Sequence, residues 1–315
     1  MNRKAIIFGI KGTKLTNEES KLIQLEKPWG IILFDRNINN ISQLKNLTSN
    51  IRSKVKDKYY PILIDQEGGT VSRLNKILNF SLFPQEYFGN LYKLNKANFK
   101  KNYKIYVDHV SDLLNNIGIN INTVPVLDIA RSKTHKIIGD RAFSKNCNLV
   151  RKIGIHCNNL FLKNRIGTVM KHIPGHGLAQ VDSHFKTPTV NNSKKELKSK
   201  DFKPFKFCKS PFAMTSHVIY KKYDPIFTAT HSKIIISEII RKYIGFKGLL
   251  ISDDISMKSL RFNLEKNATT AIDAGCNIVM HCNGNIKEMR RLVKIIPKID
   301  SFTIKKTSQF YKFLR

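Results

Sequence analysis

A short polar segment, residues 171–184, gathers several proton-active side chains. It follows the apolar run 166–170 and contains Lys171, His172, His176, Asp182 and His184. Its glycines and proline favour a loop. A carboxylate that hydrogen-bonds one ring nitrogen of a histidine fixes the tautomer and raises the basicity of the other nitrogen. Asp182 and His184 are therefore a candidate acid/base pair, although D-x-H alone is an unspecific pattern.

The spacing of His172 and His176 also raises the question of a metal. Two histidines four residues apart can bind one metal when they lie on a helix. Pro174 and Gly175 stand between them and disfavour that helix, and a zinc site requires a defined tetrahedral set of ligands. We therefore expect no metal and no organic cofactor. For His176 we expect only ordinary hydrogen bonds within the loop.

Two adjacent carboxylates, Asp253 and Asp254, follow the apolar stretch 248–251. Neighbouring side chains at the end of a strand point in different directions. One should face a pocket, and the other should cap the following helix or pair with a base. A helix cap suits Asp254 better. A carboxylate held near the anomeric carbon of a sugar can act as a nucleophile.

Further polar residues at strand ends are candidates for ligand binding. Asp65 follows the apolar run 61–64 and precedes two glycines that allow a sharp turn, so it could accept hydrogen bonds from substrate hydroxyls. Arg73 and Arg141 offer planar donor groups for a ligand. For either arginine, the alternative is a surface ion pair.

The elements that must position these residues are short apolar runs alternating with longer amphipathic stretches. The candidate strands are 5–10, 30–34, 61–64, 121–127, 167–170, 212–215, 248–251 and 277–280. The candidate helices between them include 42–55, 103–117, 149–163, 233–244 and 268–274. Such alternation predicts a parallel sheet.

The carboxyl ends of the strands decide between two kinds of parallel sheet. All but the first end beside a carboxylate or a histidine, and a (β/α)8 barrel would bring these ends together on one face. A doubly wound sheet would instead need a Gly-rich first turn, which residues 9–12 match only weakly. The sequence therefore predicts an α/β fold, a (β/α)8 TIM-type barrel, with residues 1–315 as a single domain.

The net charge and the cysteines indicate which partners and which cellular compartment to expect. The net charge of +32 invites a nucleic-acid partner, but the lysines are spread along the whole chain, as AT-biased coding would produce, and we expect no functional nucleic-acid binding. Residues 186–209 are lysine-rich and predict a solvated helix with its approaches. Five scattered cysteines without a CxxC pair fit reduced thiols in the cytosol.

Targeting signals are weak. No apolar run approaches the roughly 18 residues that span a bilayer, and the stretch 5–10 is too short for a signal peptide. We expect a cytoplasmic monomer that does not engage a membrane.

Four motifs, taken together and in order, resemble family 3 glycoside hydrolases. The quoted motifs are DQEGG followed by an arginine, GDRAFS, KHIPGHG followed by DSH, and KGLLISDDISM. The likeness spans nearly the whole chain and is specifically to the single-domain bacterial β-N-acetylglucosaminidases of peptidoglycan recycling. One departure is Ile173, where the family usually has Phe, and it keeps an apolar side chain.

The resemblance implies a role for each matching position. Asp253 would be the nucleophile, and His184, oriented by Asp182, would be the general acid/base. The residues that would bind N-acetylglucosamine are Asp65, Arg73, Arg141, Lys171 and His172. The implied activity is a retaining exo-β-N-acetylglucosaminidase acting on GlcNAc–1,6-anhydro-MurNAc muropeptides. The alternatives are a β-N-acetylglucosaminide phosphorylase, because a histidine acid/base would not repel phosphate, and a non-catalytic basic binding protein.

Overall fold

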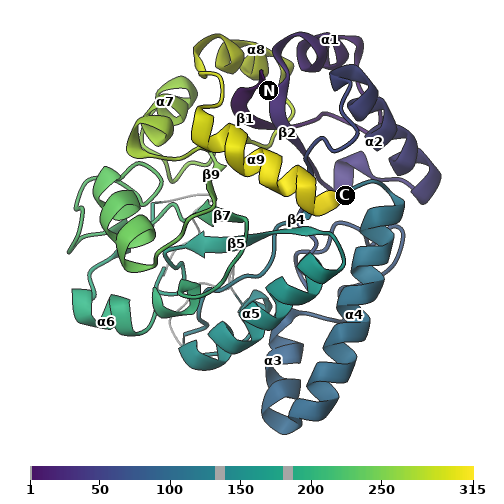
Figure 1. Ribbon diagram of the computed structural model, residues 1–315. Helices are drawn as coiled ribbons and strands as arrows, with labels where there is room; N and C mark the ends of the chain where they lie inside the picture. Colours follow the sequence, from purple (N-terminus) through teal and green to yellow (C-terminus); the bar gives the residue numbers. More distant parts are fainter. Residues whose placement is uncertain (1, 132–138, 180–186) are drawn as a thin grey trace.

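Eight parallel strands close into a barrel in this computed structural model, which describes residues 2–131, 139–179 and 187–315. The barrel strands are β1 Lys4–Gly9, β2 Pro28–Leu33, β3 Ile62–Ile64, β4 Ile121–Asn122, β5 Gly167–Ile173, β7 Phe212–Thr215, β9 Leu249–Asp254 and β10 Ile278–His281. They follow one another in chain order around the barrel (Figure 1), and β1 pairs with β10 to close it. The predicted (β/α)8 fold is confirmed, and every predicted strand contributes to it.

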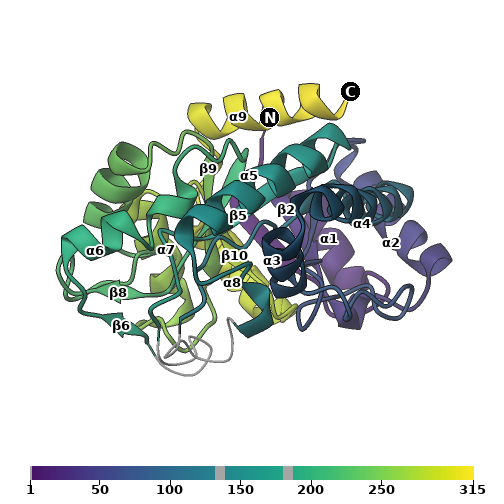
Figure 2. The ribbon, with the colours of Figure 1, turned by 90° about the horizontal axis from the view of Figure 1, so that it is seen from below.

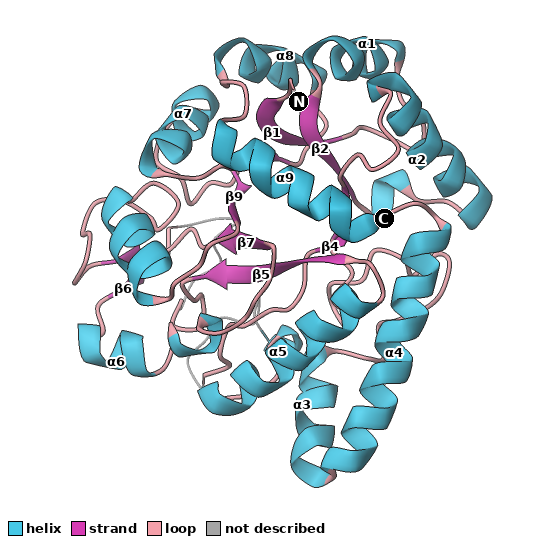
Figure 3. Cartoon of the chain, viewed as in Figure 1, coloured by secondary structure: helices cyan, strands magenta, loops and turns pink. Residues whose placement is uncertain are grey.

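Helices surround the barrel (Figures 1 and 3). The α-helices are α1 Asn17–Glu26, α2 Ile41–Val55, α3 Gln85–Leu94, α4 Lys96–Asn116, α5 Cys147–Lys163, α6 Lys194–Ser199, α7 Leu264–Ala274, α8 Ile286–Ile295 and α9 Ser301–Leu314. A π-helix, Ile235–Tyr243, lies between β7 and β9, and 3-10 turns span Asp35–Asn37, Gly139–Arg141 and Lys203–Phe205. Each predicted helix overlaps one of these elements.

Local sequence explains several helix ends. Thr16 begins α1 with a capping box. Its side chain accepts from the Glu19 amide, and the Glu19 carboxylate accepts from the Thr16 amide. Asn40 begins α2 by accepting from the Gln43 amide at 2.9 Å. The π-helix ends just before Gly245, whose φ of +79° favours glycine. These signals place the loops between the strand ends and the helices.

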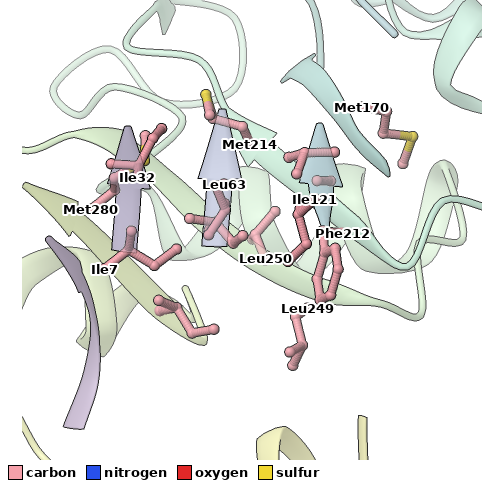
Figure 4. Packing of buried hydrophobic residues seen from close by; sticks show 14 of the residues in the cluster. Ile7, Ile32, Leu63, Ile121, Met170, Phe212, Met214, Leu249, Leu250 and Met280 are labelled. Carbon is pink, nitrogen blue, oxygen red and sulfur yellow. The ribbon is translucent and has the colours of Figure 1, made fainter. Parts of the chain in front are cut away.

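Apolar side chains from the strands fill the interior of the barrel (Figure 4). Helix α9 then covers the end where the strands begin, lying across the barrel in Figure 2. Its Phe310 packs edge-on against Phe212 at the start of β7, with ring centroids 5.1 Å apart. Its Thr307 accepts a hydrogen bond from the Trp29 indole of β2 at 2.8 Å. With that end covered, the opposite face of the barrel is left for a site.

Two features differ from the sequence-based expectations. A small parallel pair, β6 Thr189–Val190 and β8 Ile219–Tyr220, lies outside the barrel and was not predicted. The segment 186–209 was expected to be solvated, and that expectation is partly wrong. Residue 186 lies outside the described residues, but Leu197, Phe202 and Phe205 are buried, because the apolar side chains between the lysines join the hydrophobic core. Within the described residues, no helix is long and apolar enough to cross a bilayer.

Candidate active site

A cavity of about 270 Å³ opens at the carboxyl ends of the barrel strands. Six of the residues predicted from sequence line it: Asp65, Arg73, Arg141, Lys171, His172 and Asp253. Asp182 and His184 lie outside the described residues. A larger cavity, about 700 Å³, lies at the other end of the barrel beside α9, and the residues described around it include no carboxylate or histidine. The smaller cavity is therefore the candidate active site.

Lys171 holds two carboxylates together at the floor of this pocket. The lysine comes from β5 and is buried, with Nζ 2.9 Å from Asp65 Oδ1 and 2.5 Å from Glu67 Oε1. Arg73 adds a longer contact to Asp65, at 3.7 Å. Burial alone would raise the pKa of Asp65, but Lys171 and Arg73 outweigh it and hold the pKa well below its usual range. Asp65 is thus an ionised acceptor.

Glu67 is a site residue for which the sequence analysis proposed no role. Its carboxylate is fully buried and accepts from Arg141 Nε at 2.8 Å and Nη2 at 2.9 Å. Burial would raise the pKa of Glu67, but Arg141 and Lys171 lower it below its ordinary value. A signal for Glu67 was present, because it stands two residues after Asp65, and alternate residues of an extended chain share a face.

Asp128 joins the two histidines of the pocket. Its Oδ2 lies 2.6 Å from Nδ1 of His172, and its Oδ1 accepts from the His176 backbone amide at 2.6 Å. Burial would raise the pKa of Asp128, but His172 outweighs it and the pKa is lowered. Asp128 was recognised in the sequence only as a strand end. Its ionised carboxylate accepts the Nδ1 proton of His172 and so fixes the orientation of that ring.

His176 also lines the pocket, which the expected role in loop structure alone did not anticipate. Its ring centroid is 5.7 Å from that of His172. Burial lowers the pKa of His176 to about 4, so the ring is neutral near pH 7.

Asp253 and Asp254 both line the pocket from the end of β9. Oδ1 of Asp253 accepts from the Asp254 amide at 2.8 Å. Asp254 accepts from the amide and hydroxyl of Ser256, at 3.0 and 2.8 Å. Of the two predicted alternatives, the helix cap is wrong for Asp254, because the chain turns at Ser256 and α7 begins only at Leu264. The other alternative, pairing with a base, agrees with the contact of 3.9 Å between Oδ1 of Asp254 and Nδ1 of His281. Asp254 is occupied in that turn.

Within the described part of the chain, no group of three or more histidine, cysteine, aspartate and glutamate side chains is arranged to hold a metal ion. The described residues assemble a pocket lined by acidic and basic side chains, with Asp253 among the carboxylates. Ionised acceptors and cationic donors in one small cavity suit a polyhydroxylated ligand.

The model of the Glycosyl hydrolase family 3 N terminal domain matches residues 4–307. This chain belongs to that family. It is therefore a glycoside hydrolase, as the sequence motifs led us to expect. The family 3 chain is 31% identical over 288 residues to a β-hexosaminidase of Neisseria gonorrhoeae strain NCCP11945, covering 89% of this chain and 78% of the relative.

A second relative and a solved structure agree with this assignment. A β-hexosaminidase of Haemophilus influenzae is 31% identical over 293 residues, covering 89% of this chain and 79% of the relative. NagZ from Neisseria gonorrhoeae, solved in complex with N-trifluoroacetyl-D-glucosamine, superposes with a TM-score of 0.87 at 27% identity. That alignment covers all of this chain and 91% of NagZ.

Proposed function

We propose that this family 3 chain is a retaining exo-β-N-acetylglucosaminidase. The observation that carries the proposal is the pocket at the barrel mouth, where Asp253 stands beside the ionised Asp65 and its cationic partner Lys171. The β-hexosaminidase names of the relatives support the N-acetylhexosaminide class. Asp182 and His184 lie outside the residues that the structure describes, and their catalytic roles are proposed from the sequence motif.

In the first step, Asp253 attacks the anomeric carbon through an oxocarbenium-like transition state. A bond forms between its carboxylate oxygen and that carbon, while the bond to the leaving oxygen breaks. His184 gives its proton to the leaving oxygen, and Asp182 stabilises the imidazolium before that transfer. In the second step, His184 takes a proton from water, which attacks the same carbon and frees Asp253. Net retention of configuration follows from the two displacements.

The remaining pocket residues bind the sugar. Asp65, held ionised by Lys171, accepts hydrogen bonds from ring hydroxyls, and Arg73 and Arg141 donate to ring substituents. His172 is oriented by the contact of its Nδ1 with Asp128, and its other ring nitrogen is left to bind the sugar. Each of the three cations, Arg73, Arg141 and Lys171, contacts a carboxylate, which fixes its position for donating to the sugar.

The proposed substrates are muropeptides of the GlcNAc–1,6-anhydro-MurNAc type. Their peptide carboxylates are anionic, and a protein with a net charge of +32 raises the local concentration of anions. We further propose that residues 1–315 form one catalytic domain, because the eight strands close into a single barrel. We also propose that this domain acts as a cytoplasmic monomer.

Release of 4-methylumbelliferone from its β-N-acetylglucosaminide tests the proposal. Wild type should turn over, and Asp253→Ala should abolish turnover. His184→Ala should keep a residual rate, because this leaving group needs little acid help. Asp273→Ala, an exposed carboxylate on α7, is the matched control and should behave as wild type. Product formed only with phosphate present, as a sugar phosphate, would indicate a phosphorylase. Folded wild-type protein that shows no turnover, with or without phosphate, would refute the proposed activity.

A further inference from the structure

Behind the candidate active site lies an open cavity of about 490 Å³, which we name the aromatic groove. It runs between α4 and the segment that leads into α3, and its lining includes Leu78, Phe83, Tyr87, Asn102, Ile105 and Tyr106. Figure 1 shows α3 and α4 side by side, projecting from the barrel wall. None of the catalytic chemistry described above uses this groove.

The composition of the aromatic groove departs from that of the whole chain. Half of its lining residues are Phe or Tyr, against 10% aromatic residues overall. No Lys or Arg is found among the described residues that line it, although Lys and Arg number 55 in the sequence. AT-biased coding spreads lysines over the chain and does not explain why the described lining of the groove has none. A lining without Lys or Arg suits a ligand of low charge.

Apolar side chains in the groove are open to solvent. Leu78 is 52% exposed, Ile105 47%, Tyr87 43% and Phe83 38%. Contiguous exposed apolar surface of this kind commonly marks a binding site. Polar groups lie among these side chains, because the exposed residues Asn79, Asn102 and His109 also line the groove. The ligand must therefore offer apolar faces and hydrogen-bonding groups together.

Packed side chains and two hydrogen bonds connect the groove to the loop that carries Asp65 and Glu67. Phe83 stacks on Phe88, and the Phe88 ring lies 4.9 Å from that of Tyr106. Tyr106 then donates from its hydroxyl to the Glu67 carbonyl at 3.2 Å, and the Gly69 amide donates to the Phe80 carbonyl at 3.1 Å. The loop that carries Asp65 and Glu67 thus separates the pocket from the groove, which lies immediately beside it.

We propose that the aromatic groove is a second saccharide-binding site, distinct from the pocket where the bond is cut. The C–H face of a pyranose ring is weakly positive and packs against the negative face of an aromatic ring. The Asn102 amide can both donate and accept, as sugar hydroxyls require, whereas Asn79 offers its NH2 group, because its oxygen already accepts from Ser81. The absence of cations suits neutral sugar rings, in contrast to anionic peptide stems.

A second copy of this chain is the competing occupant. A stable interface between proteins buries on the order of 1,200–2,000 Å², and self-association here would remove water from Asn79, Asn102 and His109, which costs free energy unless each finds a partner. Sugar hydroxyls supply those partners directly. The groove lies beside the loop that carries Asp65 and Glu67, and this position also favours a glycan over a second copy of the chain.

Calorimetric titration with N,N′,N″-triacetylchitotriose tests the site. The protein carries Asp253→Asn, so that the probe stays intact, and chromatography of the probe after each titration verifies this. Adding Tyr87→Ala should weaken one binding event about threefold to tenfold, the range for a lost aromatic contact. Asn102→Ala should weaken the same event and serves as the second variant. Phe302→Ala, an aromatic of matched exposure on α9, should change nothing.

The outcomes separate this site from the proposed function. With Asp253 intact, Tyr87→Ala should leave turnover of the small fluorogenic substrate unchanged, because that substrate fills only the pocket. If the wild-type protein does not turn over the fluorogenic substrate, the catalytic proposal is overturned, and the calorimetric result still tests the saccharide site. Identical titrations for Tyr87→Ala, Asn102→Ala and Phe302→Ala would overturn the saccharide site. A dimer in gel filtration that Tyr87→Ala converts to monomer would assign the groove to self-association instead.

Discussion

Glu67 neutralises two cations at once, since its carboxylate contacts both Arg141 and Lys171 in the interior of the site. Removing the charge with Glu67→Gln leaves these buried cations with less compensation, and breaking a buried ion pair costs about 3–5 kcal/mol. We expect the free energy of unfolding to fall by that order and kcat/KM on the fluorogenic substrate to fall with it, because Lys171 loses its position.

Urea unfolding and steady-state kinetics check this expectation. The matched control is Glu86→Gln, an exposed residue on α3, which should stay within about 0.5 kcal/mol of wild type. Unchanged stability in Glu67→Gln would mean that Asp65 alone balances Lys171.

Asp128 is a positioning residue for His172. An asparagine at this position still accepts from the His176 amide, but its NH2 group would then face Nδ1 of His172 and favour the opposite tautomer. We expect Asp128→Asn to raise KM by about tenfold or more, equivalent to roughly 1.4 kcal/mol, while kcat changes less, because His172 is proposed to hold the sugar. Asp112→Asn, exposed on α4, is the control. An equal loss in kcat alone would place His172 in the chemical step.

At the scale of elements, the strands were predictable because a parallel barrel buries both faces of each strand, so each reads as a continuous apolar run. β4 is shorter than the predicted 121–127, since Pro125 lacks an amide for the ladder. β6 and β8 escaped prediction, because two-residue strands have no periodicity and pair across a long separation in sequence.

Helices and side-chain partners were predictable to different degrees. α1 was missed although its capping box at Thr16 and Glu19 is readable in the sequence, because few of its residues are apolar. Asp65, Lys171 and Asp253 could be placed at one face once the barrel was inferred. The contact between Asp128 and His172 could not, since the two come from different strands and no local pattern joins them.

Helix α9 contributes stability by closing one end of the barrel. Phe310 is 3% exposed and packs against Phe212, so Phe310→Ala should lower the free energy of unfolding by about 3–5 kcal/mol, the cost of an aromatic cavity. Phe302→Ala on the same helix, at 37% exposure, should cost far less. Denaturant midpoints of the two variants test this. Equal midpoints would show that α9 packs loosely on the barrel.

At the scale of the whole molecule, buried histidines make stability depend on pH. Burial lowers the pKa of both His176 and His231 to about 4, whereas an unfolded chain titrates its histidines near pH 6.5. Between those values the unfolded state binds more protons, so the free energy of unfolding falls as the pH drops from about 6.5 to 4. Each histidine contributes a slope of up to about 1.4 kcal/mol per pH unit.

Thermal or urea unfolding between pH 7 and 4.5 measures that slope. His231→Gln should make the curve shallower without touching the pocket, because His231 donates to the Asn267 carbonyl and is not among the described residues that line the pocket. His109→Gln, an exposed histidine, should leave the slope as it is. A slope unchanged by His231→Gln would place the acid sensitivity elsewhere.

The pairing of β1 with β10 also governs how the protein is made. The two strands meet at Ile6 and Val279, so β1 leaves the ribosome first and finds its last neighbour only after nearly all of the chain has been synthesised. Until then it presents one unpaired edge and the apolar residues Ile7 and Phe8, which favour aggregation of a nascent chain. Barrel closure is thus a late event of biosynthesis, and a chaperone that shelters the first strand would act during that interval.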